Sequence, residues 1–405
     1  MGFRRRQLVN LLLAANANRP LGGRLGVASF FASWAPTELA PQLIGLTTLD
    51  TAQSVVRRKA KPIDVLLGLT NIALLSRLAM GSRHTADLAE RSLVEALGAD
   101  YGAALGPAEP RATWRQLARP FHMKAAEVEV LKNVQYAGTG LRGRLDILRP
   151  RHRQSAPMPV LVQVHGGAWI VGSKEEQGQL LMNKMAPQGW ICVAINYRLA
   201  PKHPWPTQIV DVKRALAWVR EHIADYGGDP GHIVITGGSA GGHLASLAAL
   251  SANDPAYQPG FEAADTHVDA CVPFYGVFDM AGDSGDRSVT MMRDEFLAPR
   301  VFGKKFRGHE DEFRSASPLN RLDTLDPGAI PDFYVLHGSA DTMVSVSQAR
   351  AFVKRMREVS TRSVTYTELP GAQHAFEIFG SVRSYQIVSA VARWLEWQRA
   401  QRVVA

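Results

Sequence analysis

The chain has 405 residues, of which 46% are hydrophobic and 20% charged. This length and composition predict a globular protein with a large core, and they exclude a disordered or collagen-like chain. The formal net charge of +9 is uneven, because residues 1–61 hold nine basic and only two acidic side chains. No nucleic-acid-binding motif accompanies this basic segment, so we expect no nucleic-acid partner.

Residues 1–120 are expected to form a helical N-terminal region ahead of a catalytic domain at residues 121–405. The basic start, residues 4–6, and the apolar run that follows it resemble a secretory signal peptide. The run is short and is interrupted by Asn10, so we expect a retained amphipathic helix rather than a cleaved leader. Residues 98–110 contain glycine and proline and are expected to link the two regions.

Residues 25–49 and 65–80 are largely apolar. The first stretch contains two prolines and a glutamate, and the second is shorter than the ~20 residues of a spanning helix, so we expect neither to cross a membrane. Residues 85–97 are expected to form an ordinary amphipathic helix. Two roles stay open for the region: a cap over the catalytic domain, and peripheral contact of residues 1–80 with an anionic membrane surface, by an otherwise cytoplasmic protein.

From residue 127 the pattern changes to short apolar runs that alternate with helical segments. Strands are expected at 127–130, 145–148, 159–164, 190–195, 232–236, 269–275, 333–336 and 363–369, and helices at 210–224, 345–358 and 384–398. This alternation predicts an α/β fold with a mostly parallel, doubly wound sheet and helices on both faces. Cys192 and Cys271 lie in two of the apolar runs and are expected to be reduced, buried thiols.

The sequence around Ser239 predicts a nucleophile elbow. A β-branched run at residues 233–236 leads into the glycine-flanked serine, and an alanine-rich helical pattern follows. Gly237 and Gly241 lie two residues to either side, where a side chain would crowd a strained strand-to-helix corner. The start of the following helix would direct the Ala240 amide toward a developing oxyanion. An ordinary glycine-rich loop is the alternative interpretation.

A second glycine motif, HGGAW at residues 165–169, follows directly after a predicted strand. Consecutive glycines let backbone amides approach a reacting carbonyl, so Gly166 and Gly167 are the expected partners of Ala240 in an oxyanion hole. His165 is expected to hold this loop in place rather than to act as a base.

Two loops late in the chain supply the acid and the base that a serine nucleophile needs. Asp341 follows a predicted strand, at the edge where doubly wound sheets collect their sites, whereas Asp332 lies at the start of that strand and is the poorer candidate. His374 lies between the last strand and the last helix and is the expected general base. Each could be an ordinary loop residue, but the chain order serine, acid, histidine favours the catalytic interpretation.

Together these motifs resemble the hormone-sensitive-lipase-like branch of the α/β-hydrolase esterases. The most specific element is the segment YRLAPKHPWP at residues 197–206, because no general catalytic requirement dictates it. The resemblance extends from about residue 125 to the end of the chain. The family usually has a third glycine where Ala168 stands, and often an aspartate where Gly238 stands. N-terminal helices often form a lid in this branch, and residues 279–317 are expected to form a second cap element.

The resemblance implies a serine hydrolase for short- to medium-chain or lipid-like carboxylic esters, with neither metal nor organic cofactor. The residues implied are the triad Ser239, Asp341 and His374 and the oxyanion donors Gly166, Gly167 and Ala240. Two alternatives stay open. The same triad could cleave amides, as in an amidase, deacetylase or peptidase. The chain could also be a membrane-associated, noncatalytic binding protein on the same fold, although such relatives lose the histidine that this chain keeps.

Overall fold

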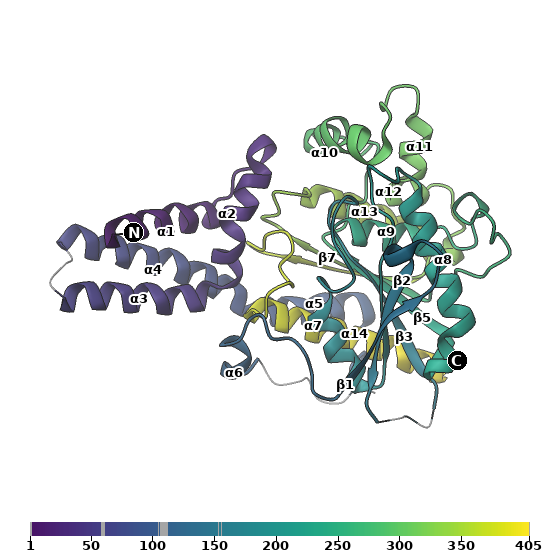
Figure 1. The fold of residues 1–405 in the computed structure, drawn as a ribbon, viewed down its shortest axis with the longest axis horizontal. Helices are drawn as coiled ribbons and strands as arrows, with labels where there is room; N and C mark the ends of the chain where they lie inside the picture. Colours follow the sequence, from purple (N-terminus) through teal and green to yellow (C-terminus); the bar gives the residue numbers. More distant parts are fainter. Residues whose placement is uncertain are drawn as a thin grey trace.

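The computed structural model describes residues 2–57, 61–103, 105, 112–152, 154 and 156–404. Its centre is an eight-stranded sheet in the order β1-β2-β4-β3-β5-β6-β7-β8 (Figure 1). The first two strands and β4 pair antiparallel, and all other neighbours are parallel. The strands are β1 (Val128–Gln135), β2 (Arg144–Pro150), β3 (Met158–Val164), β4 (Ile191–Ile195), β5 (Gly228–Gly238), β6 (Ala270–Phe274), β7 (Asp332–Gly338) and β8 (Val364–Leu369).

The central strands are buried along their whole length, which explains their continuous apolar sequences. Every residue of β3, β4 and β6 is buried. A strand with helices on both sides has no solvent-facing positions, so the alternation typical of half-exposed strands disappears. The predicted mostly parallel sheet is confirmed, and the thiols of Cys192 and Cys271 are free and buried in it.

Helices cover both faces of the sheet and create two apolar cores, one on each face. One core is formed with α8 (Thr207–His222), α9 (Ala240–Ala249) and α13 (Val346–Val359). The other is formed with α5 (Thr85–Leu97), α7 (Gln179–Met185) and α14 (Val382–Val404). The helices at 85–97, 210–224, 345–358 and 384–398 were predicted from their spacing, whereas the seven-residue α7 was not.

A cap of short helices follows β6, where residues 279–317 were expected to form one. It consists of α10 (Arg287–Met292), the π-helix η6 (Arg293–Phe302), α11 (Glu310–Ser315) and the adjoining α12 (Pro318–Arg321). Phe302 and Phe313 stack with ring centroids 3.8 Å apart and fix η6 against α11. The cap therefore has a packed interior of its own.

The N-terminal region is helical, as predicted, but its helices have different surroundings. It contains α1 (Phe3–Asn18), α2 (Gly26–Glu38), α3 (Ala40–Val56), α4 (Pro62–Arg83), α5 and the single turn α6 (Trp114–Leu117). α1, α3 and α4 pack together and extend away from the sheet (Figure 1), and we call these three helices the N-terminal bundle. α2 and α5 contribute Phe30, Ala89 and Leu93 to a core of the sheet.

The boundary between the two predicted regions, at residues 120 and 121, stays a prediction. Of the predicted linker at 98–110, residues 104 and 106–110 lie outside the described residues. Because α5 lies ahead of this segment and packs beside β8 and α14, the core of the sheet draws on both sides of the boundary. α4 has 22 residues and is longer than the sixteen-residue apolar stretch at 65–80 indicated.

Candidate active site

Ser239 occupies the turn between β5 and α9. Its backbone has φ 59° and ψ −122°, a left-handed conformation that is costly for a residue with a side chain. A Cβ atom on Gly237 would lie 2.6 Å from the Gly241 carbonyl group, closer than side chains are found. The predicted strained corner is present. Glycine is required on both sides of the serine because backbone segments approach too closely there to leave room for a side chain.

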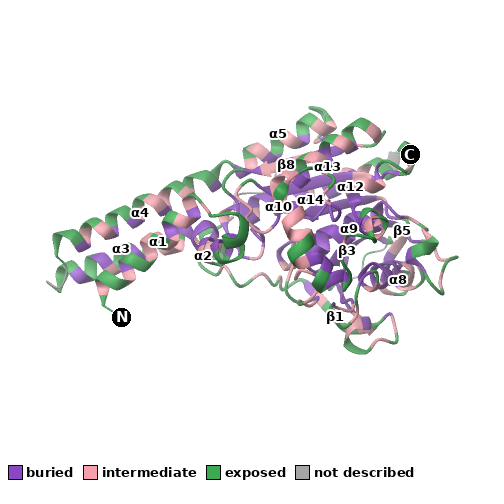
Figure 2. Cartoon of the chain, turned by 90° about the horizontal axis from the view of Figure 1, so that it is seen from above, coloured by how far each residue is buried: buried purple, intermediate pink, exposed green. Residues whose placement is uncertain are grey.

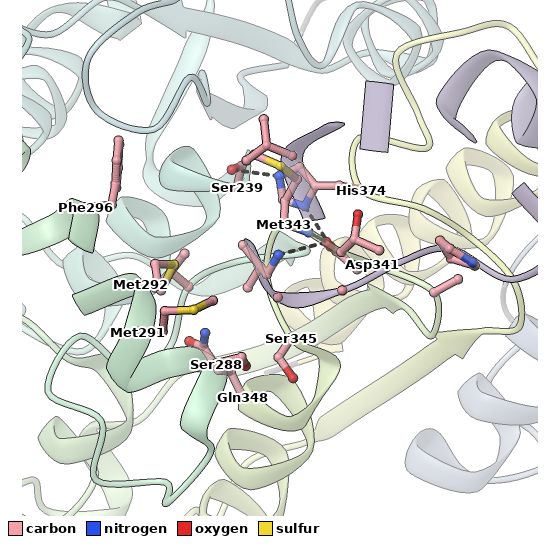
Figure 3. A pocket seen from close by; sticks show the side chains of 18 of the residues that line it. Ser239, Ser288, Met291, Met292, Phe296, Asp341, Met343, Ser345, Gln348 and His374 are labelled. Carbon is pink, nitrogen blue, oxygen red and sulfur yellow. Dashed lines mark hydrogen bonds and ion pairs between the residues drawn. The ribbon is translucent and has the colours of Figure 1, made fainter. Parts of the chain in front are cut away.

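A chain of hydrogen bonds joins the three residues predicted as nucleophile, base and acid (Figure 3). His374 Nε2 is 2.8 Å from Ser239 Oγ, and His374 Nδ1 is 2.6 Å from Asp341 Oδ2. The histidine lies on the loop after β8 and the aspartate on the loop after β7, so the parallel strands deliver both loops to the edge of the sheet beside the serine.

The Asp341 carboxylate is fully buried, and both of its oxygens have hydrogen-bond donors. Its Oδ1 accepts hydrogen bonds from the amides of Met343 and Val344, each at 2.8 Å, and His337 Nε2 lies 3.4 Å from its Oδ2. Burial by itself favours the neutral acid, but the His374 and His337 imidazoles outweigh it and lower the pKa of Asp341 below its ordinary value. The carboxylate is therefore held ionised beside His374.

The loop at residues 165–169 lies against the elbow, as the oxyanion prediction requires. The hydrogen bonds of the described residues leave the amides of Gly167 and Ala240 without an acceptor. The Gly166 amide differs, because it donates to Gln177 Oε1 at 2.6 Å. A role for Gly166 as an oxyanion donor stays a prediction and requires release of Gln177. The next residue, Ala168, which the motif did not single out as a donor, lines the cavity next to Ser239.

The residues predicted to be structural or poorer candidates lie away from the nucleophile's hydrogen bonds. His165 is buried, stacks on Tyr197 at 4.3 Å, and contacts the Gly166 carbonyl through Nδ1. Burial lowers the pKa of His165 to about 4, which keeps the ring neutral. Asp332, at the start of β7, accepts hydrogen bonds from Ser363 and fixes the adjacent strand.

The contacts of the segment 197–206 account for its characteristic sequence. Arg198 forms a bidentate ion pair with Asp211 of α8. Trp205 packs against His243 of α9, whose Nδ1 accepts a hydrogen bond from Trp169. The segment therefore connects α8, α9 and the loop at 165–169, and it supports the site without touching the triad.

A buried tyrosine and glutamate occupy the neighbourhood of Gly238, where relatives often have an aspartate. A Cβ on Gly238 would lie 2.7 Å from the Tyr275 hydroxyl, so no side chain fits here. That hydroxyl donates to Glu377, and the Tyr275 ring lies 4.5 Å from His374. Burial raises the pKa of Glu377 to about 7. No local sequence pattern indicated this pair, because its members are 102 residues apart.

Helix α2 contacts the loops of both Asp341 and His374. Gln373 Oε1 accepts from the amides of Thr342 and His374, and its Nε2 donates to Ser33 Oγ of α2 at 3.1 Å. Trp34 Nε1 donates to the Ala375 carbonyl at 2.9 Å.

The same helix adds a van der Waals contact and an ion pair. Phe30 meets the His374 ring edge-on, with the centroids 5.9 Å apart. Near the end of α2, the buried Glu38 pairs with Arg383 and accepts a hydrogen bond from Ser381. The N-terminal region therefore holds the acid and base loops directly, a role that no local sequence pattern indicated.

The triad opens into a cavity of about 830 Å³ (Figure 3). Its lining is mainly apolar near Met291, Met292 and Phe296 of the cap. Another side is formed by residues of the N-terminal region: Asn18, Arg19, Pro20, Gly22, Gly23, Arg24 and Val27. This size and lining are typical of a site for a small organic molecule or an acyl chain. Within the described part of the chain, no cluster of histidine, cysteine or carboxylate side chains is arranged to hold a metal ion.

Comparison with known proteins assigns the family. The family model described as BD-FAE matches residues 145–356. The probable carboxylic ester hydrolase LipM of Mycobacterium tuberculosis is 41% identical and aligns with 96% of this chain and 93% of its own length. Esterase LipQ of the same organism is 47% identical over 65% of this chain and 61% of its own length. The similarity to LipM therefore includes the N-terminal region, whereas that to LipQ covers about two thirds of the chain.

Solved structures agree on the fold. The esterase Est2 of Thermogutta terrifontis with bound butyrate has a TM-score of 0.55 and 25% identity, over 67% of this chain and 93% of its own. A truncated carbohydrate esterase from gut microbiota has a TM-score of 0.56 and 24% identity, over 69% of this chain and 100% of its own, which shows the fold alone. The chain belongs to the BD-FAE family, within the hormone-sensitive-lipase-like esterases of the α/β-hydrolase fold.

Proposed function

We propose that this esterase cleaves carboxylic esters through an acyl-enzyme on Ser239. His374 Nε2 takes the Ser239 proton as Oγ attacks the ester carbonyl, and the ionised Asp341 stabilises the resulting imidazolium. The protonated His374 then donates to the leaving alcohol. Water, activated by the same imidazole, releases the acid and restores the serine. The observation that carries this proposal is the hydrogen-bond chain from Oγ through the imidazole to the carboxylate, at 2.8 and 2.6 Å.

The amides of Gly167 and Ala240 are the proposed donors to the oxyanion, because both lack acceptors in the described part of the chain and Ala240 directly follows the serine. Ala168 is a third candidate, since it lines the cavity. Gly166, the remaining sequence-based candidate, can contribute only after its amide leaves Gln177. This proposal expects the Gln177 side chain to fix the loop in the resting enzyme.

Short- to medium-chain or lipid-like esters are the proposed substrates, and the mainly apolar cavity supports this class. The names of LipM and LipQ, a carboxylic ester hydrolase and an esterase, favour esters over amides. Membrane contact by residues 1–80 of an otherwise cytoplasmic protein belongs to the same proposal. The basic and exposed apolar side chains of that segment support the contact.

The test is hydrolysis of p-nitrophenyl esters of increasing acyl length by the wild type and Ser239→Ala. We expect the variant to lose at least about 10⁴-fold in kcat/KM, as is usual when a triad serine is removed. Ser246→Ala, a buried serine further along α9, is the matched control and should keep its activity. A fluorophosphonate should label the wild type at Ser239. Undiminished turnover by Ser239→Ala would overturn the proposed mechanism.

Matched ester and amide substrates test the alternatives. Faster cleavage of the ester by several orders of magnitude supports an esterase, whereas equal or faster amide cleavage would identify an amidase, deacetylase or peptidase. Binding of esters without turnover or phosphonate labelling would favour the noncatalytic alternative.

A further inference from the structure

The N-terminal bundle exposes its large apolar side chains. Leu12 is 71% exposed and Leu49 is 69% exposed, although both lie in helices that pack against neighbours. The full set of exposed large apolar side chains in α1, α3 and α4 is Leu8, Val9, Leu12, Leu46, Leu49, Val55, Val56, Ile63, Leu66, Leu69 and Met80. Figure 2 shows exposed positions along all three helices where they extend away from the sheet. Such a surface is large for a protein in water.

The interior of the bundle is polar. Gln7 and Asn71 are completely buried, and Asn71 Nδ2 donates to Gln7 Oε1 at 2.8 Å. Gln7 Nε2 in turn donates to Asp50 at 3.0 Å, and Asp50 pairs with Arg6 at 2.6 Å. A hydrogen-bonded polar network therefore lies where a water-soluble bundle would have its apolar core.

Small residues replace a conventional core at the contacts between these helices. Gly68 of α4 packs directly against Thr51 of α3, and a Cβ on Gly68 would collide with that threonine side chain. The fully buried apolar cluster of the bundle is small and consists of Ala14, Ala40 and Leu75, with the half-buried Leu43, Ile44, Leu74, Leu78 and Ala79 packed against it. Close contact of small residues and hydrogen bonds between helices are how helices associate inside a bilayer, where the hydrophobic effect does not drive association.

A long stretch of each helix in the bundle lacks charged side chains, and we call these three uncharged stretches together the belt. Residues 7–18, 40–49 and 65–76 contain no charged side chain. At the outer end, Arg4, Arg5, Arg6, Arg57 and Lys61 form a basic tip. The Arg4–Asp64 pair, at 2.5 Å, lies at the same end. This distribution complements a hydrocarbon layer bounded by anionic headgroups.

We propose that the N-terminal bundle is embedded in a lipid bilayer, with its belt in the hydrocarbon layer and its basic tip among anionic headgroups. α4 has 22 residues and is about 33 Å long, close to the ~30 Å of the hydrocarbon layer. Within the described residues, an 18-residue window of the helical stretch Pro62–Leu97 also has the hydropathy of a membrane span. This goes beyond the sequence-based expectation, which was that neither apolar stretch crosses a membrane and which left contact with a membrane surface open.

A bilayer fits this surface better than a protein partner. The exposed apolar side chains lie on all three helices of the bundle, whereas a second copy or another protein would cover one face. The polar interior also supports a bilayer, because buried side-chain hydrogen bonds replace a hydrophobic core when the surroundings are themselves apolar. The inference deepens the membrane contact proposed above and does not depend on catalysis.

Cysteine labelling tests the environment of the belt. Cys192 and Cys271 are buried, so new single cysteines report cleanly. Leu12→Cys and Leu49→Cys place thiols in the belt, and Lys305→Cys places one on the exposed surface of the cap. The full chain is reconstituted in phosphatidylcholine vesicles containing phosphatidylglycerol and treated with a membrane-impermeant maleimide. We expect the belt thiols to react at least about tenfold more slowly than Lys305→Cys, and all three to react equally after denaturation.

Fractionation provides a second readout. Membranes from cells that express the full chain are washed with high salt and then with alkaline carbonate, and the protein should stay in the membrane. The triple variant Leu12→Gln, Leu49→Gln, Leu69→Gln should be released, while its hydrolysis of a short soluble ester stays near the wild-type rate. Leu141→Gln, an exposed leucine outside the bundle, is the matched control and should be retained.

Three results would overturn the inference. These are release of the wild type by carbonate, labelling of the belt thiols as fast as Lys305→Cys, and recovery of the wild type as a detergent-free soluble oligomer. Ser239→Ala should fractionate like the wild type. The membrane result is therefore independent of the proposed chemistry, and either proposal can fail alone.

Discussion

The catalytic domain and the N-terminal bundle distribute polar and apolar side chains in opposite ways. In the catalytic domain, strands such as β3 and β4 are apolar and completely buried between helices. In the bundle, Gln7 and Asn71 are buried while Leu12 is mostly exposed. One region is therefore built by burying apolar surface from water, and the other by satisfying polar groups internally. Helix α2 lies between them and holds the loops of Asp341 and His374.

The catalytic side of this comparison is most sharply tested by Asp341→Asn. The substitution removes the charge that stabilises the imidazolium and keeps the size of the side chain, so we expect kcat to fall by about 10³- to 10⁴-fold. Steady-state hydrolysis of p-nitrophenyl butyrate measures the loss. Membrane retention should be unchanged, because Asp341 lies in the catalytic domain.

Asp332→Asn is the matched control, since Asp332 begins the strand that ends near Asp341. Its activity should stay within a few-fold of the wild type. If the two variants lost activity equally, the acid would have been assigned wrongly.

Glu38→Gln tests the border between the two regions. Arg383 would keep its buried charge without the carboxylate partner, and breaking a buried ion pair in this way costs about 3–5 kcal/mol. We expect the midpoint of thermal unfolding of the full chain in detergent to fall accordingly. Asp323→Asn removes one of two partners of Arg355, the other being Glu358, at an exposed ion pair and should cost less than about 1 kcal/mol. Equal shifts in the two variants would mean that α2 is not tied to the catalytic domain through this pair.

Glu377→Gln tests whether the buried Glu377 makes the stability of the catalytic domain depend on pH. Burial raises the pKa of Glu377 to about 7 in the folded protein from 4.5 when exposed, so the folded state binds more protons between these values. The free energy of unfolding should therefore fall as pH rises from 4.5 to 7, by about 3 kcal/mol relative to Glu377→Gln. Denaturant unfolding at pH 5 and pH 7.5 measures this difference.

Glu368→Gln is the control of opposite sign. The hydrogen bond from Arg350 lowers the pKa of Glu368, so the wild type should gain stability relative to this variant as pH rises through the acidic range. If the free energy of unfolding of the wild type, relative to Glu377→Gln, rose with pH, the result would contradict a buried, protonated Glu377.

The sequence predicted those parts of the molecule that depend on local pattern. The continuous apolar runs identified the central strands, and the glycines around Ser239 identified a strained corner that the structure contains. The chain order of the motifs was sufficient to select Asp341 and His374, which lie in one hydrogen-bond chain. Their catalytic roles and those of the oxyanion donors await the experiments above.

Features that depend on distant partners could not be predicted. Nothing near Gly166 indicates that Gln177 occupies its amide, and nothing near Trp34 indicates that it meets the loop of His374. The N-terminal helices were ambiguous for a related reason. An apolar helical stretch has the same sequence pattern whether a protein core or a bilayer covers it, so only packing separates α2 and α5 from the bundle.

The contact between α2 and the loop of His374 joins an early part of the chain to a late one. Trp34 and Ala375 are 341 residues apart, so α2 is synthesised long before its partner loop exists. Contacts of such high sequence separation belong to the long-range topology that slows folding. A nascent chain can therefore contain Ser239, the proposed nucleophile, before His374, the proposed base, has been synthesised. Under the proposed mechanism, the first residues of the chain support the last loop of the site only after synthesis of the whole domain.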